Sequence, residues 1–345
     1  MPKMALLTIV VSGSVPDLGI RETEKTLGCN VRRIGKRIGL IELESTCLRH
    51  ALAKLYECVY IQEVLFGKAW TNYPQPEASF YYELGCNSEW SEIAGKTFAV
   101  SVKKIDGFPS TPSTELIVNI AKAVHSACNG HCNVNLSNPD VHVRLICAPD
   151  AAVIGVQALR PRGDRFRLRS NKFKVFRHPA SLTPEDARLL VNLTGEPRLL
   201  LDPFCGTGTV LAETALKGIE AVGLDVSIEA VKGCWSNMKL FSVDALCNVI
   251  VGDARKPPFR QESFDAISTD PPYGKLATTR GASAQTLQKC LLNLSSSIIK
   301  KSGFTVFMRP KEYFSQLYSA KSKIFEEYSI YVHGGLTRIV CLLSG

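Results

Sequence analysis

Apolar residues along the second half of the chain, from about residue 180, fall into short runs of strand length separated by stretches with helical spacing. Four consecutive apolar runs each end in an aspartate: Asp202, Asp225, Asp253 and Asp270. Amphipathic stretches at 209–218, 227–241 and 283–299 predict helices. This repeated strand–helix–strand order is typical of a mostly parallel sheet covered by helices on both faces. The last two apolar runs, 324–333 and 337–343, predict an antiparallel hairpin at the edge of that sheet.

The first half of the chain has a mixed pattern. Short apolar runs at 5–11, 38–44 and 59–70, together with a helical stretch at 45–57, predict a small α+β domain over residues 1–92.

A second α+β domain is predicted from residue 93 to residue 159. A strand at 97–105 and a capped helix at 110–128 precede two further strands at 141–149 and 151–159. The chain is therefore divided into a first domain (1–92), a second domain (93–159), a linker (160–179) and an α/β domain (180–345).

Composition and cysteine usage place the chain among folded proteins of a reducing compartment. With 345 residues, 45% hydrophobic and 21% charged, the chain is long enough for two or three domains. The apolar start at residues 5–13 is too short to cross a membrane, so we expect a first strand there rather than a signal peptide. Twelve cysteines without disulfide-like spacing indicate free thiols in the cytoplasm. The group His125, Cys128, His131 and Cys132 lacks standard zinc spacing, so no metal is expected.

Nearly all of the net charge of +9 comes from one short segment. Residues 1–159 hold 15 basic and 15 acidic side chains, and residues 178–345 hold 18 and 16. The basic segment, RPRGDRFRLRSNKFKVFR (160–177), holds eight basic residues, one acid and three phenylalanines. Although a solvated linker is the alternative, concentrated positive charge beside aromatic rings is typical of surfaces that bind a phosphate backbone. The expected contacts are Arg160, Arg162, Arg165, Arg167, Arg169, Lys172, Lys174 and Arg177.

The four aspartates are expected to meet at one edge of the sheet, where parallel strands end and where such sheets bind ligands. Like charges gathered there need a cationic or donor-rich ligand among them. Asp202 opens the loop DPFCGTGTV, in which Gly206 and Gly208 allow a tight turn into a helix. Leu211 replaces the third glycine of the dinucleotide fingerprint, and no GK[ST] follows. S-adenosylmethionine, a sulfonium cation without a pyrophosphate, fits this loop.

Spacing assigns parts of that cofactor to two further acids. Asp225 follows Asp202 by 23 residues, close to the spacing at which an acid binds both ribose hydroxyls. Asp253, after the third strand, can accept a hydrogen bond from the adenine amino group.

The sequence DPPY, which follows a buried apolar run, predicts methyl transfer to an aromatic amine. An exocyclic amino group of a nucleobase is a poor nucleophile because its lone pair is delocalised into the ring. The carboxylate of Asp270 and the carbonyl of Pro271 can accept its two protons, and Pro271 and Pro272 hold both acceptors in place. Tyr273 offers a flat face for the base. Whether Asp270 also takes the proton is left open.

These motifs resemble the class I methyltransferases that act on amino groups, whose signature is [DNS]PP[YFW]. LDPFCGTGTVLAE followed by STDPPYG is similar to the THUMP-domain RNA methyltransferases, and most of all to the archaeal tRNA (guanine(10)-N2)-methyltransferases. VNLSNPDVHVRL resembles the THUMP strand, and FRHPASLTPEDARLLVNLTG resembles the segment before the cofactor loop. The resemblance covers most of 93–345, whereas the first ninety residues match only in length and mixed composition. Thr209 stands where relatives often have glycine or serine.

The resemblance implies an α/β, Rossmann-like class I methyltransferase domain preceded by ferredoxin-like and THUMP domains that grip the acceptor end of tRNA. It implies transfer of one or two methyl groups from S-adenosylmethionine to N2 of guanosine in tRNA, with the need for a small activator subunit left open. The implied cofactor-binding residues are His178, Pro179, Asp202, Gly206, Thr207, Gly208, Asp225, Asp253 and Ala254. The implied catalytic residues are Asp270, Pro271, Pro272 and Tyr273.

Several other functions share parts of this pattern. A THUMP enzyme acting on another tRNA guanosine or on a ribosomal one has the same motifs. A DNA adenine-N6 methyltransferase also uses DPPY but has no role for the THUMP-like region. A protein-glutamine methyltransferase usually has Asn in place of Asp270. The intact catalytic loop counts against a non-catalytic RNA-binding subunit.

Overall fold

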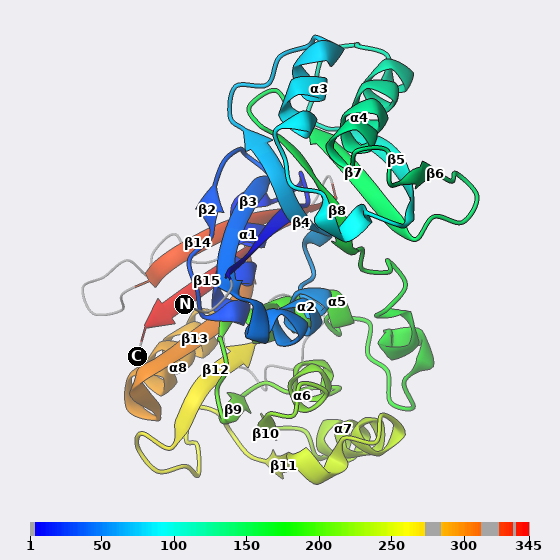
Figure 1. Cartoon of the computed structure of the whole chain (residues 1–345). Helices are drawn as coiled ribbons and strands as arrows, with labels where there is room; N and C mark the ends of the chain where they lie inside the picture. Colours follow the sequence, from blue (N-terminus) through cyan, green and yellow to red (C-terminus); the bar gives the residue numbers. More distant parts are fainter. Residues whose placement is uncertain (1–3, 273–283, 312–323, 334–335, 345) are drawn as a thin grey trace. The chain divides into compact units, whose positions relative to one another are not determined.

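The computed structural model describes residues 4–272, 284–311, 324–333 and 336–344 (Figure 1). The chain forms two compact units, Met1–Pro161 and Arg162–Gly345. The division predicted at residue 92 falls inside the first unit, and most of the predicted linker falls inside the second. These finer boundaries stay predictions.

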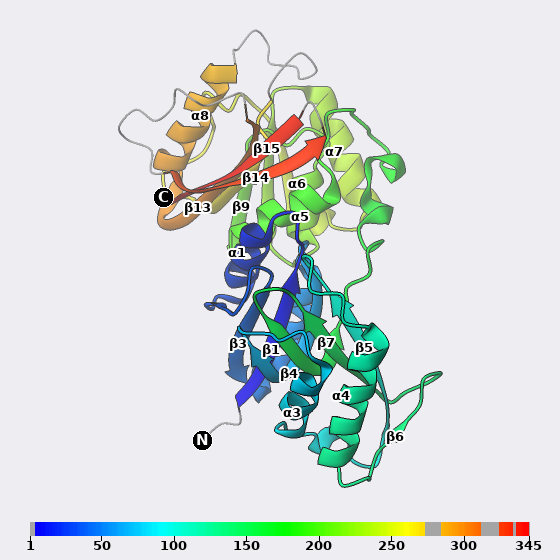
Figure 2. The same cartoon turned by 90° about the horizontal axis from the view of Figure 1, so that it is seen from above.

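The first unit is built on one eight-stranded mixed sheet in the order β2-β3-β1-β4-β8-β7-β5-β6. Figure 2 shows β3, β1 and β4 side by side in this sheet. Its strands are β1 (Met4–Val11), β2 (Arg32–Arg33), β3 (Ile38–Glu44), β4 (Ile61–Thr71), β5 (Thr97–Lys104), β6 (Asn133–Val134), β7 (Val141–Cys147) and β8 (Ala152–Leu159). Its α-helices are α1 (Pro16–Leu27), α2 (Leu48–Glu57), α3 (Ala78–Cys86) and α4 (Ser113–Ala127). Because β4 pairs antiparallel with β8, the sheet continues from the first ninety residues into the part that follows.

Helix α1 was not predicted, because its buried side is unusually polar. Alongside apolar residues it buries Glu22, whose carboxylate accepts hydrogen bonds from the backbone N–H groups of Val59 (2.7 Å) and Tyr60 (3.0 Å). Two buried threonines on the same helix weaken the apolar periodicity further. A helix that buries polar groups gives little signal to a search for apolar spacing.

The second unit contains a seven-stranded sheet in the order β11-β10-β9-β12-β13-β15-β14. Its strands are β9 (Leu199–Asp202), β10 (Glu220–Asp225), β11 (Cys247–Val251), β12 (Phe264–Thr269), β13 (Ile299–Pro310), β14 (Ile324–His333) and β15 (Leu336–Ser344). Its α-helices are α5 (Pro184–Leu193), α6 (Thr209–Ala215), α7 (Ile228–Leu240) and α8 (Ala284–Ser297). Strands β9 to β13 pair in parallel, whereas β15 pairs antiparallel with β13 and β14. This confirms the predicted α/β fold with a terminal antiparallel hairpin.

The strand order reverses between β9 and β12, because the chain runs from β9 outward to β11 and then returns to β12 on the other side of β9. In a parallel sheet such a reversal leaves a crevice at the carboxyl ends of the two strands. The core beneath the crevice is apolar and includes Leu201, Leu224, Ile267 and Phe307, which are completely buried. These residues fix the strand ends that carry polar groups.

The two cysteines of the group His125, Cys128, His131 and Cys132 belong to a packed core, whereas the two histidines are exposed. Cys128 and Cys132 are buried, and the Nδ1 of His125 lies 3.0 Å from the carbonyl oxygen of Cys132. In the described ranges, no three His, Cys, Asp or Glu side chains are grouped so as to hold a metal ion. All twelve cysteines are free thiols. Among the described helices, none has the length and apolar character needed to span a bilayer.

Candidate active site

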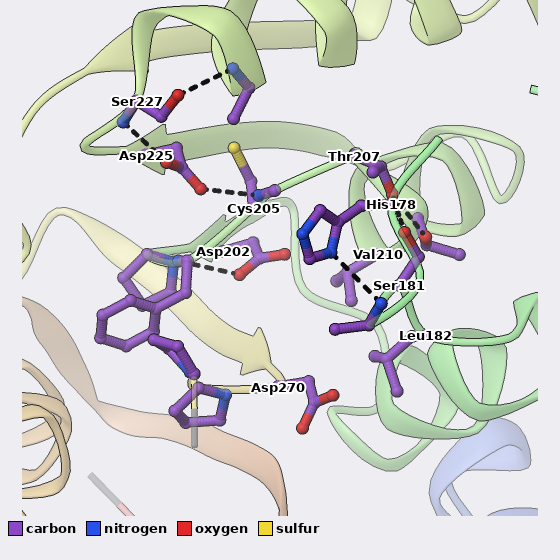
Figure 3. Close-up of a pocket in the computed structure, with 18 of the residues that line it drawn as sticks. His178, Ser181, Leu182, Asp202, Cys205, Thr207, Val210, Asp225, Ser227 and Asp270 are labelled. Atoms are coloured by element: carbon purple, nitrogen blue, oxygen red, sulfur yellow. Dashed lines mark hydrogen bonds between the residues drawn. The ribbon is translucent and has the colours of Figure 1, made fainter. Parts of the chain in front are cut away.

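A cavity of about 650 Å³ lies at the carboxyl ends of the parallel strands of the second unit (Figure 3). Asp202 and Asp225 are the last residues of β9 and β10, Asp270 directly follows β12, and Asp253 lies two residues beyond β11. All four aspartates line the cavity. Since β11, β10, β9 and β12 are neighbours in that order, the predicted meeting of four acidic strand ends is confirmed.

Asp225 holds the glycine loop against the end of β10. Its Oδ2 accepts a hydrogen bond from the N–H of Gly206 (2.9 Å), and its Oδ1 accepts one from the N–H of Ser227 (2.9 Å). Gly206 and Gly208 have positive φ angles of 50° and 79°, which glycine adopts at little cost. A Cβ on Gly208 would lie 2.4 Å from the Sγ of Cys234, so this glycine shapes the loop from behind the cavity.

Asp202 is the most buried acid of the site. Its Oδ1 accepts hydrogen bonds from the Thr269 hydroxyl (2.6 Å) and from the N–H of Phe204 (3.1 Å). Burial raises the pKa of Asp202 to about 7, opposed by these two hydrogen bonds and assisted by the negative charges of Asp225 and Asp270. A cation beside this carboxyl group would favour its ionised form, because opposite charges attract strongly in a buried site.

Asp253 has a different environment at the neighbouring strand end. The guanidinium of Arg255 binds it at 2.6 Å, and hydrogen bonds from Arg255 lower the pKa of Asp253. The carboxylate is therefore ionised at neutral pH but shares its oxygens with Arg255, which also lines the cavity. Ala254, between the two, lies on the same wall. An adenine amino group would have to share Asp253 with this arginine.

Of the predicted catalytic loop, Asp270, Pro271 and Pro272 all line the cavity. Tyr273 lies outside the described residues.

The segment before α5 forms the wall of the cavity opposite the strand ends. The sequence predicted only some of the residues in this wall. His178 and Pro179, predicted as cofactor contacts, line the cavity there, and the hydroxyl of Thr207 donates a hydrogen bond to that of Ser181 (3.0 Å). The sequence did not point to Ser181, Ser227 or Arg338, although all three line the cavity. Ser227 could have been found, because it follows an acidic strand end and caps α7, whereas Arg338 comes from β15 without a motif.

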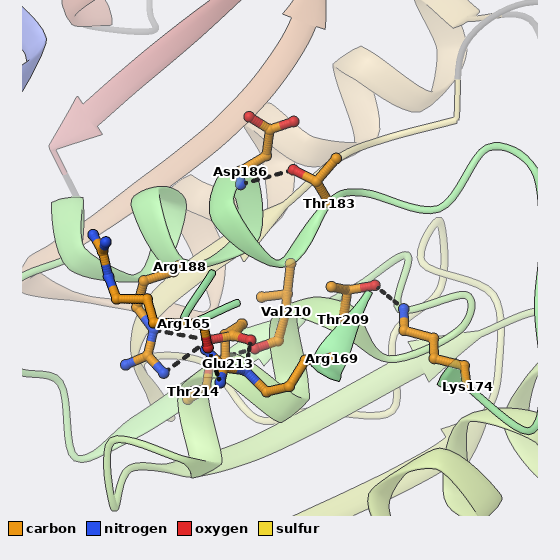
Figure 4. A network of polar contacts seen from close by, with 10 residues as sticks. All are labelled: Arg165, Arg169, Lys174, Thr183, Asp186, Arg188, Thr209, Val210, Glu213 and Thr214. Atoms are coloured by element: carbon orange, nitrogen blue, oxygen red, sulfur yellow. Dashed lines mark hydrogen bonds and ion pairs between the residues drawn. The ribbon is translucent and has the colours of Figure 1, made fainter. Parts of the chain in front are cut away.

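The basic segment (160–177) is turned partly inward (Figure 4). Lys174 is only 1% exposed, and its ammonium donates hydrogen bonds to the hydroxyls of Thr207 (3.1 Å) and Thr209 (2.5 Å). The Arg169 guanidinium binds the buried carboxylate of Glu213 at 2.6 Å. A buried ammonium cannot contact RNA, so Lys174 is removed from the predicted set as a correction.

The rest of the basic segment divides according to exposure. Phe166 is buried, and the guanidinium groups of Arg165 and Arg169 lie over its ring at 4.7 and 5.2 Å from the centroid. The exposed basic residues are Arg160, Arg162, Arg167, Lys172 and Arg177.

Comparison with known proteins gives two family matches and three informative relatives. Residues 171–339 match the RMKL-like methyltransferase domain, and residues 82–157 match the THUMP domain. The chain is 30% identical over 259 residues to the tRNA (guanine(10)-N2)-dimethyltransferase of Methanothermobacter thermautotrophicus, covering 74% of this chain and 75% of that protein. It is 31% identical over 270 residues to the protein of the same name from Methanocaldococcus jannaschii, covering 75% and 74%. The crystal structure of TrmN from Thermus thermophilus, at 20% identity, has the same fold, with a TM-score of 0.56 over 99% of each chain.

Proposed function

The chain belongs to the tRNA (guanine(10)-N2)-dimethyltransferase family, and from this premise we propose that it transfers methyl groups from S-adenosylmethionine to N2 of guanosine 10 in tRNA. The observation that carries the proposal is the meeting of four acidic strand ends and an Asp-Pro-Pro loop in one cavity. The matching THUMP domain supports RNA as the substrate.

The cavity fits the cofactor in charge and backbone shape. It is lined by four acids, and its glycine loop brings backbone close to the ligand space. Bound there, S-adenosylmethionine would supply an electrophilic methyl group. Asp202 would face its positive charges, Asp225 its ribose hydroxyls, and Asp253 with Ala254 its adenine. Gly206, Thr207, His178 and Pro179 would form the remaining contacts, with Gly208 shaping the loop.

The Asp-Pro-Pro loop would position the acceptor base. The Asp270 carboxylate and the Pro271 carbonyl would accept the two N2 protons of guanine, which turns the nitrogen lone pair toward the cofactor. Pro271 and Pro272 limit backbone rotation there, so both acceptors are placed before the base arrives. We keep Tyr273 as the proposed stacking partner of the base.

The proposed RNA contacts are the exposed part of the basic segment: Arg160, Arg162, Arg167, Lys172 and Arg177, with the half-buried Arg165 and Arg169 at its border. Long-range attraction to phosphates depends on exposed charge, which these residues provide. We also propose a cytoplasmic location, supported by twelve free thiols.

The test is nucleoside analysis of tRNA treated with the purified chain and labelled S-adenosylmethionine. We expect N2-methylguanosine and N2,N2-dimethylguanosine at position 10, and no label in a transcript with adenosine at that position. Label at another guanosine would show that the enzyme methylates a different position of tRNA. Label only in DNA or protein would overturn the proposal. Activity of the chain alone would show that no activator subunit is required.

A further inference from the structure

We propose that a hydrogen-bond relay, Lys174–Thr207–Ser181, turns the hydroxyl of Ser181 into a donor that binds the carboxylate of the amino-acid part of S-adenosylmethionine. This inference rests on the proposed function, since it names the part of the cavity that receives one group of the cofactor. Lys174 acts here as a positioning residue and Ser181 as the contact.

The relay begins at a buried charge without a counter-ion. Lys174 is 1% exposed, and its ammonium binds two hydroxyls, those of Thr207 and Thr209. Across the described part of the chain it forms no salt bridge, and the nearby carboxylate of Glu213 is bound by Arg169 and Arg188 at 2.6 and 2.7 Å. Buried charges are normally paired, because removing them from water is costly. An anionic ligand at the other end of the relay would offset this charge.

The ammonium fixes the direction of the hydrogen bonds that follow. A lysine ammonium has three protons and no acceptor, so the oxygen of Thr207 must accept from it. The single proton of the Thr207 hydroxyl is then directed to the oxygen of Ser181, 3.0 Å away, because the other nearby hydroxyl oxygen, that of Thr209, is farther at 3.4 Å. Ser181 therefore receives a hydrogen bond and keeps its own proton for another acceptor.

The hydroxyl of Ser181 is left to donate to a ligand in the cavity. Ser181 lines the cavity, and among the hydrogen bonds of the described residues none has its hydroxyl as donor. Hydrogen bonds in a chain polarise one another, so the positive charge at Lys174 strengthens the donor at the other end. Figures 3 and 4 show the two ends of the relay, Ser181 beside Thr207 and Lys174 beside Thr209.

The rest of the cavity favours this wall for a carboxylate, because the two guanidinium groups that line the cavity, Arg255 and Arg338, are already bound to Asp253 and Asp186. Asp202, Asp225 and Asp270 line the other side and would repel an anion. The wall of Ser181 offers a second donor in the neutral form of His178, because its Nδ1 accepts a hydrogen bond from the N–H of Ala180 (3.2 Å). The proton of that ring then lies on Nε2. The charge distribution thus orients the cofactor, with its cationic groups toward the acids and its carboxylate toward Ser181.

The experiment compares two ligands that differ in the carboxylate alone, S-adenosylmethionine and decarboxylated S-adenosylmethionine. Their affinities for the full chain are measured by calorimetry in the unmodified protein and in the variants Ser181→Ala and Lys174→Met. We expect each variant to lose about 10- to 100-fold in affinity for S-adenosylmethionine, the range of a charge-assisted hydrogen bond. The affinity for the decarboxylated ligand should change by less than about twofold, because that ligand makes no contact with the relay.

The matched control is Ser227→Ala, which removes another serine hydroxyl from the cavity wall. Ser227 caps α7, so its loss should weaken both ligands equally. The double variant Ser181→Ala/Lys174→Met should lose no more than either single variant, because both act through one hydrogen bond. Should Lys174→Met fold poorly, Ser181→Ala alone still decides the question, since it removes one small group.

Equal losses for both ligands in Ser181→Ala, or no loss for either, would overturn the relay while leaving the proposed function standing. Failure of the unmodified protein to bind S-adenosylmethionine at all would instead overturn the proposed function.

Discussion

The acidic strand ends of the second unit and the basic segment (160–177) each gather charge of one sign, and they are built in opposite ways. The aspartates sit at the ends of four adjacent strands, and all of them face one cavity. The basic segment has no such regularity, because Lys174 is buried, Arg169 binds Glu213, and Arg167 and Lys172 are exposed.

The difference shows when a charge pattern determines a location. Strand ends are placed by topology, so an acid at each end must lie at the same edge of the sheet whatever its neighbours are. An irregular segment has no period, and each side chain points where local packing allows. The sequence alone therefore predicts where the four acids lie. It does not predict which basic side chains of the segment are exposed.

The largest effect is expected from Asp270→Ala, which tests whether an acidic strand end at the cavity is needed for methyl transfer. Turnover should fall about 10³- to 10⁴-fold, because a positioned acceptor for the reacting amine is lost. Affinity for S-adenosylhomocysteine should change by less than about threefold, because Asp270 is proposed to act on the base. Single-turnover kinetics with tRNA and calorimetry measure the two quantities.

The control for this prediction is Asp265→Ala, on the same strand but near its opposite end. Asp265 accepts hydrogen bonds from the N–H groups of Arg198 (3.0 Å) and Leu199 (2.8 Å), away from the cavity. Its loss should lower stability without lowering turnover of the folded enzyme. Equal losses of turnover in both variants would mean that the effect of Asp270→Ala does not depend on the place of Asp270 at the cavity.

The second-largest effect is expected from Glu213→Gln. This variant tests whether the ion pair between Glu213 and Arg169 holds the basic segment in place. The carboxylate of Glu213 binds both Arg169 and the buried Arg188, whose side chain is 2% exposed. Removing one partner of a buried ion pair costs about 3–5 kcal/mol, because a charge is left uncompensated. Thermal denaturation should show a lower melting temperature than in Glu220→Gln, an exposed glutamate at the start of β10. Equal melting temperatures would show that the segment is not held by this pair.

Much of the fold and of the site was predictable from the sequence, because strands and helices with clear apolar patterns position most of the site residues. Period and apolar runs located β9 to β13, and their acidic ends located Asp202, Asp225, Asp253 and Asp270. Ser227 was missed although its place at a helix start could have revealed it, whereas the other surprises depend on contacts between distant segments.

Two such contacts show why sequence spacing could not reveal them. Arg338 reaches the cavity because β15 pairs with β13, and it also binds Asp186 of α5 at 2.8 Å. Lys174 is buried because its ammonium finds two threonine hydroxyls at the start of α6. In both cases the partner lies more than thirty residues away in sequence.

A third prediction separates the exposed and buried halves of the basic segment. In the triple variant Arg162→Gln/Arg167→Gln/Lys172→Gln, the slope of log affinity for tRNA against log salt should decrease in magnitude by about 2–3, near one unit per phosphate contact. Lys174→Met removes a charge from the same segment and should leave that slope unchanged, since the ammonium is buried. Filter binding from 50 to 200 mM salt gives both slopes. An unchanged slope in the triple variant would mean that the segment is a solvated linker that does not bind RNA.

The smallest effect concerns the pH dependence of stability at two neighbouring strand ends. The pKa of Asp202 rises from 3.8 to about 7 on folding because of burial. Between these values the folded chain holds a proton that the unfolded chain has lost, so this group's contribution to stability falls as pH rises toward 7. Asp202→Asn has no proton to lose. Its melting temperature minus that of the unmodified protein should therefore be higher at pH 8 than at pH 5, by roughly 5 °C.

Asp253→Asn is the matched comparison, because hydrogen bonds from Arg255 lower the pKa of that carboxyl below 3.8. A lowered pKa contributes stability that is present above the unfolded value and is lost only as pH falls through the folded value. The difference in melting temperature between Asp253→Asn and the unmodified protein should hence be the same at pH 5 and pH 8. A pH-independent difference for Asp202→Asn as well would show that Asp202 is ionised throughout this range, and the contrast between the two strand ends would then disappear.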